Sequence, residues 1–163
     1  MMKINNFSLV TSYIKIFEDK PSHHTMRCYG ICQDPKSGLK RILIKGLIHR
    51  DLHIGNIVCF NSVICIAGMS SYKPVNYEEL EDNVYGVLPY VAPEILRGQI
   101  YTQASDIYSF GIIMFRIISG LPPYYDNAAH DEYLALNICE GLRPNFNIKV
   151  PQLILGLIKN CFE

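Results

Sequence analysis

The residues best suited to chemistry lie together in one short segment, residues 48–56, which reads IHRDLHIGN. This segment holds two imidazoles, a guanidinium, a carboxylate and a side-chain amide, supplied by His49, Arg50, Asp51, His53 and Asn56. On a β-strand, the alternating His49, Asp51 and His53 would point to one side, where they could bind zinc. A zinc site is therefore one interpretation of this segment, and a motif further along the chain supports another.

That second motif covers residues 85–94, which read YGVLPYVAPE. In this order, the two motifs resemble the catalytic loop of protein kinases and the substrate-docking loop with its Ala-Pro-Glu terminus. The matching docking-loop positions are Gly86, Pro89, Ala92, Pro93 and Glu94. The resemblance extends from Ile42 to the last residue. Leu-Pro-Tyr before Ala-Pro-Glu, and the later Gly-Leu-Arg-Pro, make the chain similar to the tyrosine-kinase-like group in its fungal-type expansion.

The resemblance implies transfer of phosphate from ATP to a protein hydroxyl. Asp51 would be the base that accepts the hydroxyl proton, and Asn56 would bind a Mg²⁺ ion that bridges the nucleotide phosphates. His49, Arg50 and His53 would surround the base, and Arg50 would also pair with a phosphate on the activation segment. The resemblance thus implies ATP and Mg²⁺ as cofactors and a protein substrate or protein partner.

Further positions acquire expected roles in the same way. Asp106 matches an Asp that supports the backbone of the catalytic loop, and Tyr85 and Tyr77 are candidate phosphorylation sites. Ser/Thr kinases carry a Lys two residues after the base and a Thr after the docking-loop Gly, whereas this chain has His53 and Val87 there. The acceptor hydroxyl, Ser/Thr or Tyr, is therefore not determined by this loop.

Other parts of the kinase pattern are missing. Gly68 stands where the family has the metal-binding Asp of its Asp-Phe-Gly motif, and residues 52–77 contain no Asp or Glu at all. A phosphate-covering loop needs closely spaced glycines, but the glycines before the catalytic loop are only Gly30, Gly38 and Gly46. The strand that carries the ATP-binding Lys is not found either. We therefore expect ATP and Mg²⁺ binding, and with it phosphoryl transfer, to be impaired.

The composition describes a soluble globular chain and excludes some partners. Of the 163 residues, 49% are apolar and 18% are charged, which argues against disorder. Lys+Arg and Asp+Glu balance at 15 each, so no basic field favours nucleic acid or an anionic membrane. The six cysteines lack zinc spacing and are expected to be reduced. No signal peptide or membrane span is predicted, so the expected location is cytoplasmic, with the nucleus not excluded.

The elements expected to position the motifs follow from hydrophobic patterning and turn residues. Two apolar runs, Ile57–Phe60 and Val63–Ala67, predict a hairpin. Gln103–Ser119 is predicted to be a central helix that is buried all round, capped by Thr102 and closed by Gly120. Other helices are expected over residues 6–17, 129–140 and 151–162, a strand over Met26–Cys32, a helix end over residues 39–45, and an extended loop over residues 68–91.

Together these features predict an α+β, protein-kinase-like fold. It would be mostly the helical C-terminal lobe with a small β-hairpin and an incomplete nucleotide lobe. Residues 1–38 would be a remnant of the nucleotide lobe, and residues 39–163 a C-terminal lobe that is truncated at its end. The Arg that pairs with the Ala-Pro-Glu carboxylate in the family would lie beyond this lobe, leaving Glu94 without its usual buried partner. The functional alternatives are an impaired protein kinase, an inactive pseudokinase that binds proteins, and a truncated product without a function of its own.

Overall fold

The computed structural model describes residues 46–60, 63–68, 73–74, 84, 86–126 and 132–163. These residues form four helices, two short 3₁₀ turns and two small antiparallel sheets, so the predicted α+β class is confirmed. The predicted helix over 6–17, the strand over 26–32, the helix end over 39–45 and the proposed remnant over 1–38 lie outside the described residues. The candidate phosphorylation sites Tyr77 and Tyr85 lie outside them as well.

Helix α4, Gln103–Ser119, is the central element and has the predicted bounds. Thr102 accepts a hydrogen bond from the Ser105 backbone N–H, and the Ser105 hydroxyl accepts one from the Thr102 N–H, which forms a capping box. At the other end, Gly120 adopts a left-handed conformation with φ 71°, which suits glycine at a helix C-terminus. The capping signals in the sequence therefore located both ends of this helix correctly.

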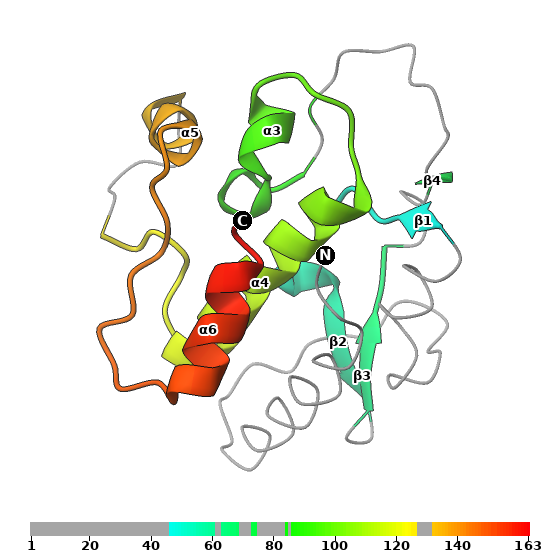
Figure 1. The fold of residues 1–163 in the computed structure, drawn as a ribbon. Helices are drawn as coiled ribbons and strands as arrows, with labels where there is room; N and C mark the ends of the chain where they lie inside the picture. Colours follow the sequence, from blue (N-terminus) through cyan, green and yellow to red (C-terminus); the bar gives the residue numbers. More distant parts are fainter. Residues whose placement is uncertain (1–45, 61–62, 69–72, 75–83, 85, 127–131) are drawn as a thin grey trace.

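The surroundings of α4 are shown in Figure 1. Helix α6, Gln152–Asn160, packs along α4, and the 3₁₀ turn η4, Leu88–Tyr90, packs against it as well. Helix α5, Glu132–Cys139, lies beside the short helix α3, Pro93–Leu96, at one end of the molecule. The predictions for α5 and α6 were thus right in type and position, whereas α3 was not predicted.

Two small sheets lie on the other side of α4. Strands β2, Ile57–Phe60, and β3, Val63–Ile66, form the predicted hairpin, with Ile57 opposite Ile66. Strands β1, Leu47–Ile48, and β4, Lys73–Pro74, pair antiparallel. The predicted loop over 68–91 was therefore wrong at β4, which pairs with β1, and at η4, where Pro89 favours a turn because its ring fixes φ.

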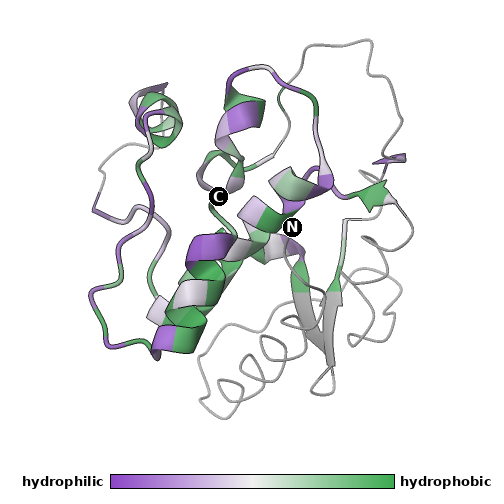
Figure 2. Cartoon of the chain, in the orientation of Figure 1, coloured by the Kyte–Doolittle hydropathy of each residue, from purple (hydrophilic) through white to green (hydrophobic). Residues whose placement is uncertain are grey.

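The core forms around α4 (Figure 2). Hydrophobic residues follow α4 and α6, and Ile112, Ile113 and Phe115 on α4 are at most 1% exposed. The prediction that α4 is buried all round was too strong, because Ile107 and Ile117 are only half-buried. Among the described residues, no helix is both long and apolar enough to cross a membrane.

Candidate active site

The candidate catalytic loop, residues 49–56, is hydrogen-bonded to a carboxylate of helix α4. Asp106 Oδ2 accepts a hydrogen bond of 2.6 Å from the His49 backbone N–H, and Oδ1 accepts one of 3.0 Å from the Arg50 N–H. Asp106 is 1% exposed. Burial raises the pKa of this carboxyl group above its usual value, and the two backbone hydrogen bonds partly oppose the rise. One side chain of α4 thus fixes the start of the loop.

His49 connects the loop to the end of the hairpin. Its Nε2 lies 2.8 Å from the Ala67 carbonyl oxygen, and its Nδ1 accepts a hydrogen bond of 3.3 Å from the Asp51 N–H. When Nδ1 accepts, a neutral ring carries its proton on Nε2, and this N–H donates a hydrogen bond to the Ala67 carbonyl oxygen. Both ring nitrogens therefore contact backbone groups, and the alternative of a zinc site that includes His49 is wrong.

Asp51 and Asn56, the two residues around which the motif was recognised, lie in contact. The Asn56 Nδ2 donates to the Asp51 carbonyl oxygen at 2.7 Å and lies 3.3 Å from Asp51 Oδ2. The 3₁₀ turn η2, Ile54–Asn56, brings Asn56 back to Asp51. Because the amide nitrogen donates to Asp51, the amide oxygen Oδ1 is the atom of Asn56 that could bind a cation.

His53 lies next to the Asp51 carboxylate. The ring accepts a hydrogen bond of 3.1 Å from the Gly55 N–H through Nδ1, so a neutral ring carries its proton on Nε2. This Nε2 lies 3.7 Å from Asp51 Oδ2. The ring centre also lies 6.2 Å from that of Tyr90. His53 therefore lies between the loop carboxylate and the candidate docking loop.

The residue opposite Asn56 is Gly68. A Cβ atom at this position would lie 3.0, 3.1 and 3.2 Å from Nδ2, Cγ and Oδ1 of Asn56. The backbone of Gly68 has a φ of +84°. The position that the sequence pattern matched to a metal-binding Asp is therefore, in space, the one that faces Asn56, and it contributes no side-chain oxygen.

The candidate docking loop lies against the same carboxylate. Gly86, with φ +117°, is so close that a Cβ there would lie 3.7 Å from Asp51 Oδ1. Pro89 and Tyr90 are buried, and the Ser109 hydroxyl on α4 donates to the Tyr90 carbonyl oxygen at 2.7 Å. A small hollow lies between this loop and Asp51, with Gly86, Val87 and Tyr90 among its lining residues. The Asp51 side chain is 33% exposed, so a bound chain could reach its carboxylate.

The residues that end the docking loop border the core and begin helix α3. Ala92 is 1% exposed, and Pro93 begins helix α3 with Glu94 in its first turn. Glu94 is half-buried, so the destabilisation of a fully buried unpaired carboxylate does not apply to it in full. Burial raises the pKa of the nearby Tyr108, with a smaller upward contribution from the charge of Glu94. The charge of Glu94 therefore affects the pKa of the buried Tyr108, although Glu94 itself is only half-buried.

Sequence reasoning missed two neighbours of the site. Arg50 has a φ of 72°, and its guanidinium lies 4.8 Å from the ring centre of Tyr101, a cation–π contact. The sequence predicted no contact for Ser109, which donates a hydrogen bond to the Tyr90 carbonyl oxygen. A tyrosine next to the helix cap Thr102 carries no local signal for an arginine so far away in the sequence. Tertiary contacts alone bring these residues to the loop.

Comparison with known proteins agrees with this geometry. The family model described as "Protein kinase domain" matches residues 4–163. The chain belongs to the protein kinase family. Members of this family generally use ATP and Mg²⁺ and act on protein substrates. The kinase fold thus accounts for the contact between Asp51 and Asn56 and for the support from Asp106.

Individual relatives show the same membership. The chain is 32% identical to a protein kinase and PP2C-like domain-containing protein of Arabidopsis thaliana, over 72% of the chain and 23% of the relative. It is 32% identical to dual specificity protein kinase shkA of Dictyostelium discoideum, over 71% of the chain and 23% of the relative. It is 28% identical to ephrin type-A receptor 7 of Gallus gallus, over 82% of the chain and 14% of the relative. The chain thus spans about a quarter or less of the length of these kinases.

The residues at the kinase site do not fit the Mg²⁺ ion that the family uses. Mg²⁺ requires near-octahedral oxygen ligands, usually with one or two carboxylates. Here Asn56 Oδ1 faces Gly68, and residues 52–77 supply no carboxylate. In the described part of the chain, no cluster of three or more His, Cys, Asp or Glu side chains could hold a metal ion. At the position opposite Asn56, the chain therefore offers no carboxylate oxygen to a cation.

Proposed function

We propose that this chain is a kinase-fold domain that works by binding a protein partner and whose phosphoryl transfer is impaired. The observation that carries the proposal is the position of Gly68 opposite the Asn56 side chain. Where the family places a carboxylate opposite the amide, this chain has a glycine without a side chain, and even an added Cβ would lie 3.0–3.2 Å from the amide atoms of Asn56. A single amide oxygen is a weak site for a strongly hydrated cation.

The surroundings of Asp51 support the protein-binding part of the proposal. The docking loop is held by Ser109 and lies with Gly86 beside the Asp51 carboxylate. Asp106 fixes the backbone of the loop from α4. These contacts serve the fold and the binding surface whether or not a nucleotide is bound. A kinase-like lobe can therefore remain useful as a surface after its metal site is lost.

The second candidate is an active protein kinase, and the geometry of Asp51 favours it. In this candidate Asp51 would accept the proton of a substrate hydroxyl, and Asn56 would keep the carboxylate oriented through its amide. Arg50 would receive a phosphate attached to Tyr85 or Tyr77. His53, 3.7 Å from Asp51, would take the place of the Lys of Ser/Thr kinases.

We also propose a finer placement within the family. Leu88-Pro89-Tyr90 before the Ala-Pro-Glu segment, and the later Gly-Leu-Arg-Pro, favour the tyrosine-kinase-like group in its fungal-type expansion. Balanced charge and reduced cysteines favour a cytoplasmic location, with the nucleus not excluded. The division of the chain into a nucleotide-lobe remnant over residues 1–38 and a C-terminal lobe over residues 39–163 is part of the same proposal.

A thermal-shift experiment tests the proposed function. A ligand raises the melting temperature only if it binds the native state. We expect MgATP to leave the melting temperature of the full chain unchanged. A clear rise that disappears in Asn56→Ala would contradict the proposal. Incubation with radiolabelled MgATP tests the kinase candidate, because autophosphorylation that is lost in Asp51→Asn would establish it.

A further inference from the structure

Helix α5 carries large apolar side chains on two opposite faces. Its inner face holds Leu134 and Ile138, which are 1% and 0% exposed and belong to the core. Its outer face holds Tyr133 and Leu136, which are 76% and 60% exposed. Residues three apart are neighbours on a helix surface, so these two side chains form one apolar stripe. The inner face belongs to the core, whereas the side chains of the outer stripe are exposed.

The helix is fixed independently of that stripe. Arg97, at the end of α3, donates to the Cys139 carbonyl oxygen, and Cys139 Sγ lies 3.7 Å from the Pro93 carbonyl oxygen. Arg143 Nη1 donates to the Ile138 carbonyl oxygen at 3.0 Å. These contacts hold the C-terminal end of α5 against α3 and the loop that follows. The outer stripe is therefore presented on a fixed helix, which lowers the ordering cost of binding.

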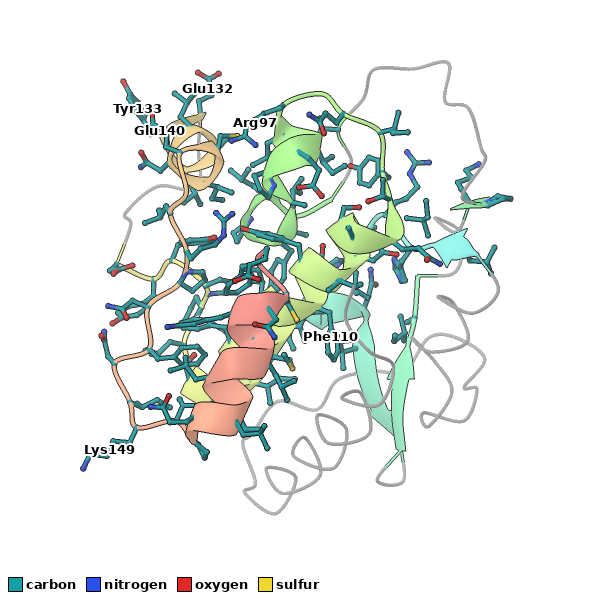
Figure 3. All side chains as sticks on the ribbon, in the orientation of Figure 1. Arg97, Phe110, Glu132, Tyr133, Glu140 and Lys149 are labelled. Carbon is teal, nitrogen blue, oxygen red and sulfur yellow. The ribbon has the colours of Figure 1, made fainter. Side chains whose placement is uncertain are left out.

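Acidic side chains flank the stripe. Glu132 begins α5, and Glu140 continues its last turn, since the Glu140 N–H donates to the Leu136 carbonyl oxygen at 2.9 Å. Both glutamates are exposed, and α5 contains no Lys or Arg. Figure 3 shows Glu132, Tyr133 and Glu140 directed away from the body of the molecule, with Arg97 on the side of α3. The outer face thus combines an apolar centre with a negative margin.

We propose that this outer face of α5, made of Glu132, Tyr133, Leu136 and Glu140, binds a basic amphipathic helix of a protein partner. The apolar side of such a helix would cover Tyr133 and Leu136, and its Lys or Arg side chains would face the two glutamates. Tyrosine is enriched at the centres of interfaces. Opposite charges at the margin select the partner and speed its approach. The glutamates thus specify a basic partner over an acidic or neutral one.

A synthetic peptide serves as the probe. It is an amphipathic helix of about 18 residues, five turns, with Leu on one face and Lys on the other. Its counterpart has every Lys replaced by Glu. Binding to the full chain is measured by fluorescence anisotropy. We expect the basic peptide to bind more weakly as salt rises and the acidic peptide not to bind. Equal binding of the two peptides, or binding of neither, would overturn the proposal.

Matched variants locate the binding. Leu136→Ser should weaken binding of the basic peptide about tenfold or more. Leu153→Ser, on α6, should not, although Leu153 is also 60% exposed. Glu132→Gln combined with Glu140→Gln should weaken binding about threefold and reduce its salt dependence. Equal losses in Leu136→Ser and Leu153→Ser would refute a site on α5.

A second copy of the chain is the main competing occupant. Sedimentation of the chain without peptide tests it, and a concentration-dependent dimer that disappears in Leu136→Ser would overturn the proposal. Unchanged melting temperatures of the variants would show that each is folded.

The inference rests on the proposed protein-binding function, but separate experiments can contradict each of the two. Binding of MgATP would contradict the proposal of impaired phosphoryl transfer without affecting the inference about α5. Unchanged binding of the basic peptide in Leu136→Ser would contradict only the inference about α5.

Discussion

The Asp106 carboxylate shows how one side chain can organise a loop more than 50 residues away. It accepts hydrogen bonds from two successive backbone N–H groups, those of His49 and Arg50, at 2.6 and 3.0 Å. Removing a buried charged acceptor leaves both donors unpaired, which costs about 1–3 kcal/mol for each group. The family resemblance predicted this role for Asp106 from the sequence. The distances give it a physical basis in this chain.

Asp106 also predicts a pH dependence of stability. Burial raises its pKa in the folded chain above the unfolded value near 3.8, so between the two values the folded chain binds more protons. The contribution of this group to stability is full below the unfolded pKa and is lost as pH rises through the folded pKa. We therefore expect the wild type to lose stability relative to Asp106→Asn as pH rises above about 4.

Urea unfolding of both proteins in small pH steps measures this difference. The variant is expected to be less stable overall, because its amide replaces one of the two accepting oxygens with an NH₂ donor that would face a backbone N–H. The informative quantity is the change of the difference with pH. A difference that is independent of pH, or one that moves in favour of the wild type as pH rises, would show that the pKa of Asp106 is not raised.

At the scale of elements, the N-terminal cap of α4 gives the simplest prediction. Thr102→Ala removes the oxygen that accepts from the Ser105 N–H at 3.3 Å. The free energy of unfolding should fall by about 1 kcal/mol. Thr102→Ser keeps the hydroxyl and should retain most of that energy. Chemical denaturation of the two variants distinguishes a lost cap from a general effect of substitution, since a general effect would lower both equally.

Two glycines in helices provide a second, paired prediction. A Cβ on Gly111 in α4 would lie 2.7 Å from Cys161 Cβ and 2.8 Å from Phe162 Cε1. Gly111→Ala should therefore cost about 1–3 kcal/mol through overpacking, more than the helix propensity that alanine gains. A Cβ on Gly156 in α6 has no neighbour within 4 Å. Gly156→Ala should instead stabilise the chain by about 0.5–1 kcal/mol.

Thermal melting of the two alanine variants checks this pair. The glycine substitutions are chemically identical, so opposite shifts of the melting temperature report the packing between α4 and the chain end that follows α6. A Gly111→Ala variant as stable as Gly156→Ala would mean that Cys161 and Phe162 do not pack closely on α4.

Local signals explain which elements could be predicted from the sequence. Helix α4 was located because Thr102 and Gly120 mark its ends, and the β2–β3 hairpin because Asn61-Ser62 separates two apolar runs. Strands β1 and β4 are two residues long and depend on each other's backbone across an intervening segment. No local pattern identifies such a pair. The same holds for Arg50 and Tyr101, which the fold brings together.

The candidate site divides in the same way. The sequence motif predicted that Asp51 and Asn56 belong to one site, and the missing acid at Gly68 could be read directly. The sequence could not show that Gly68 faces the Asn56 amide, because this placement depends on how the hairpin returns to the loop. His53 was predicted to lie beside the base, but its hydrogen bond to Gly55 was not.

At the scale of the whole molecule, the described residues form a kinase-like helical core. The docking loop is fixed to this core, whereas the candidate metal site lacks an acid opposite Asn56. The outer face of α5 is fixed by contacts to α3. Under the proposed function, the chain would therefore bind a protein better than it binds MgATP.

Restoring the acid tests this view directly. The φ of +84° at Gly68 lies in the left-handed region, where Asp is among the better tolerated residues. Asn56 must move by a few tenths of an ångström to admit the new Cβ. Gly68→Asp would then place a carboxylate beside the Asn56 amide oxygen and supply a second hard ligand. Gly68→Asn, of the same size without the charge, is the control.

The decisive measurement is calorimetric titration of ATP, with and without Mg²⁺, into the full chain, Gly68→Asp and Gly68→Asn. Our account predicts no effect of Mg²⁺ on the wild type or on Gly68→Asn, and an affinity for ATP in Gly68→Asp that rises with Mg²⁺. Binding of ATP to the wild-type chain that is tightened about tenfold or more by Mg²⁺, with no further gain in Gly68→Asp, would contradict it.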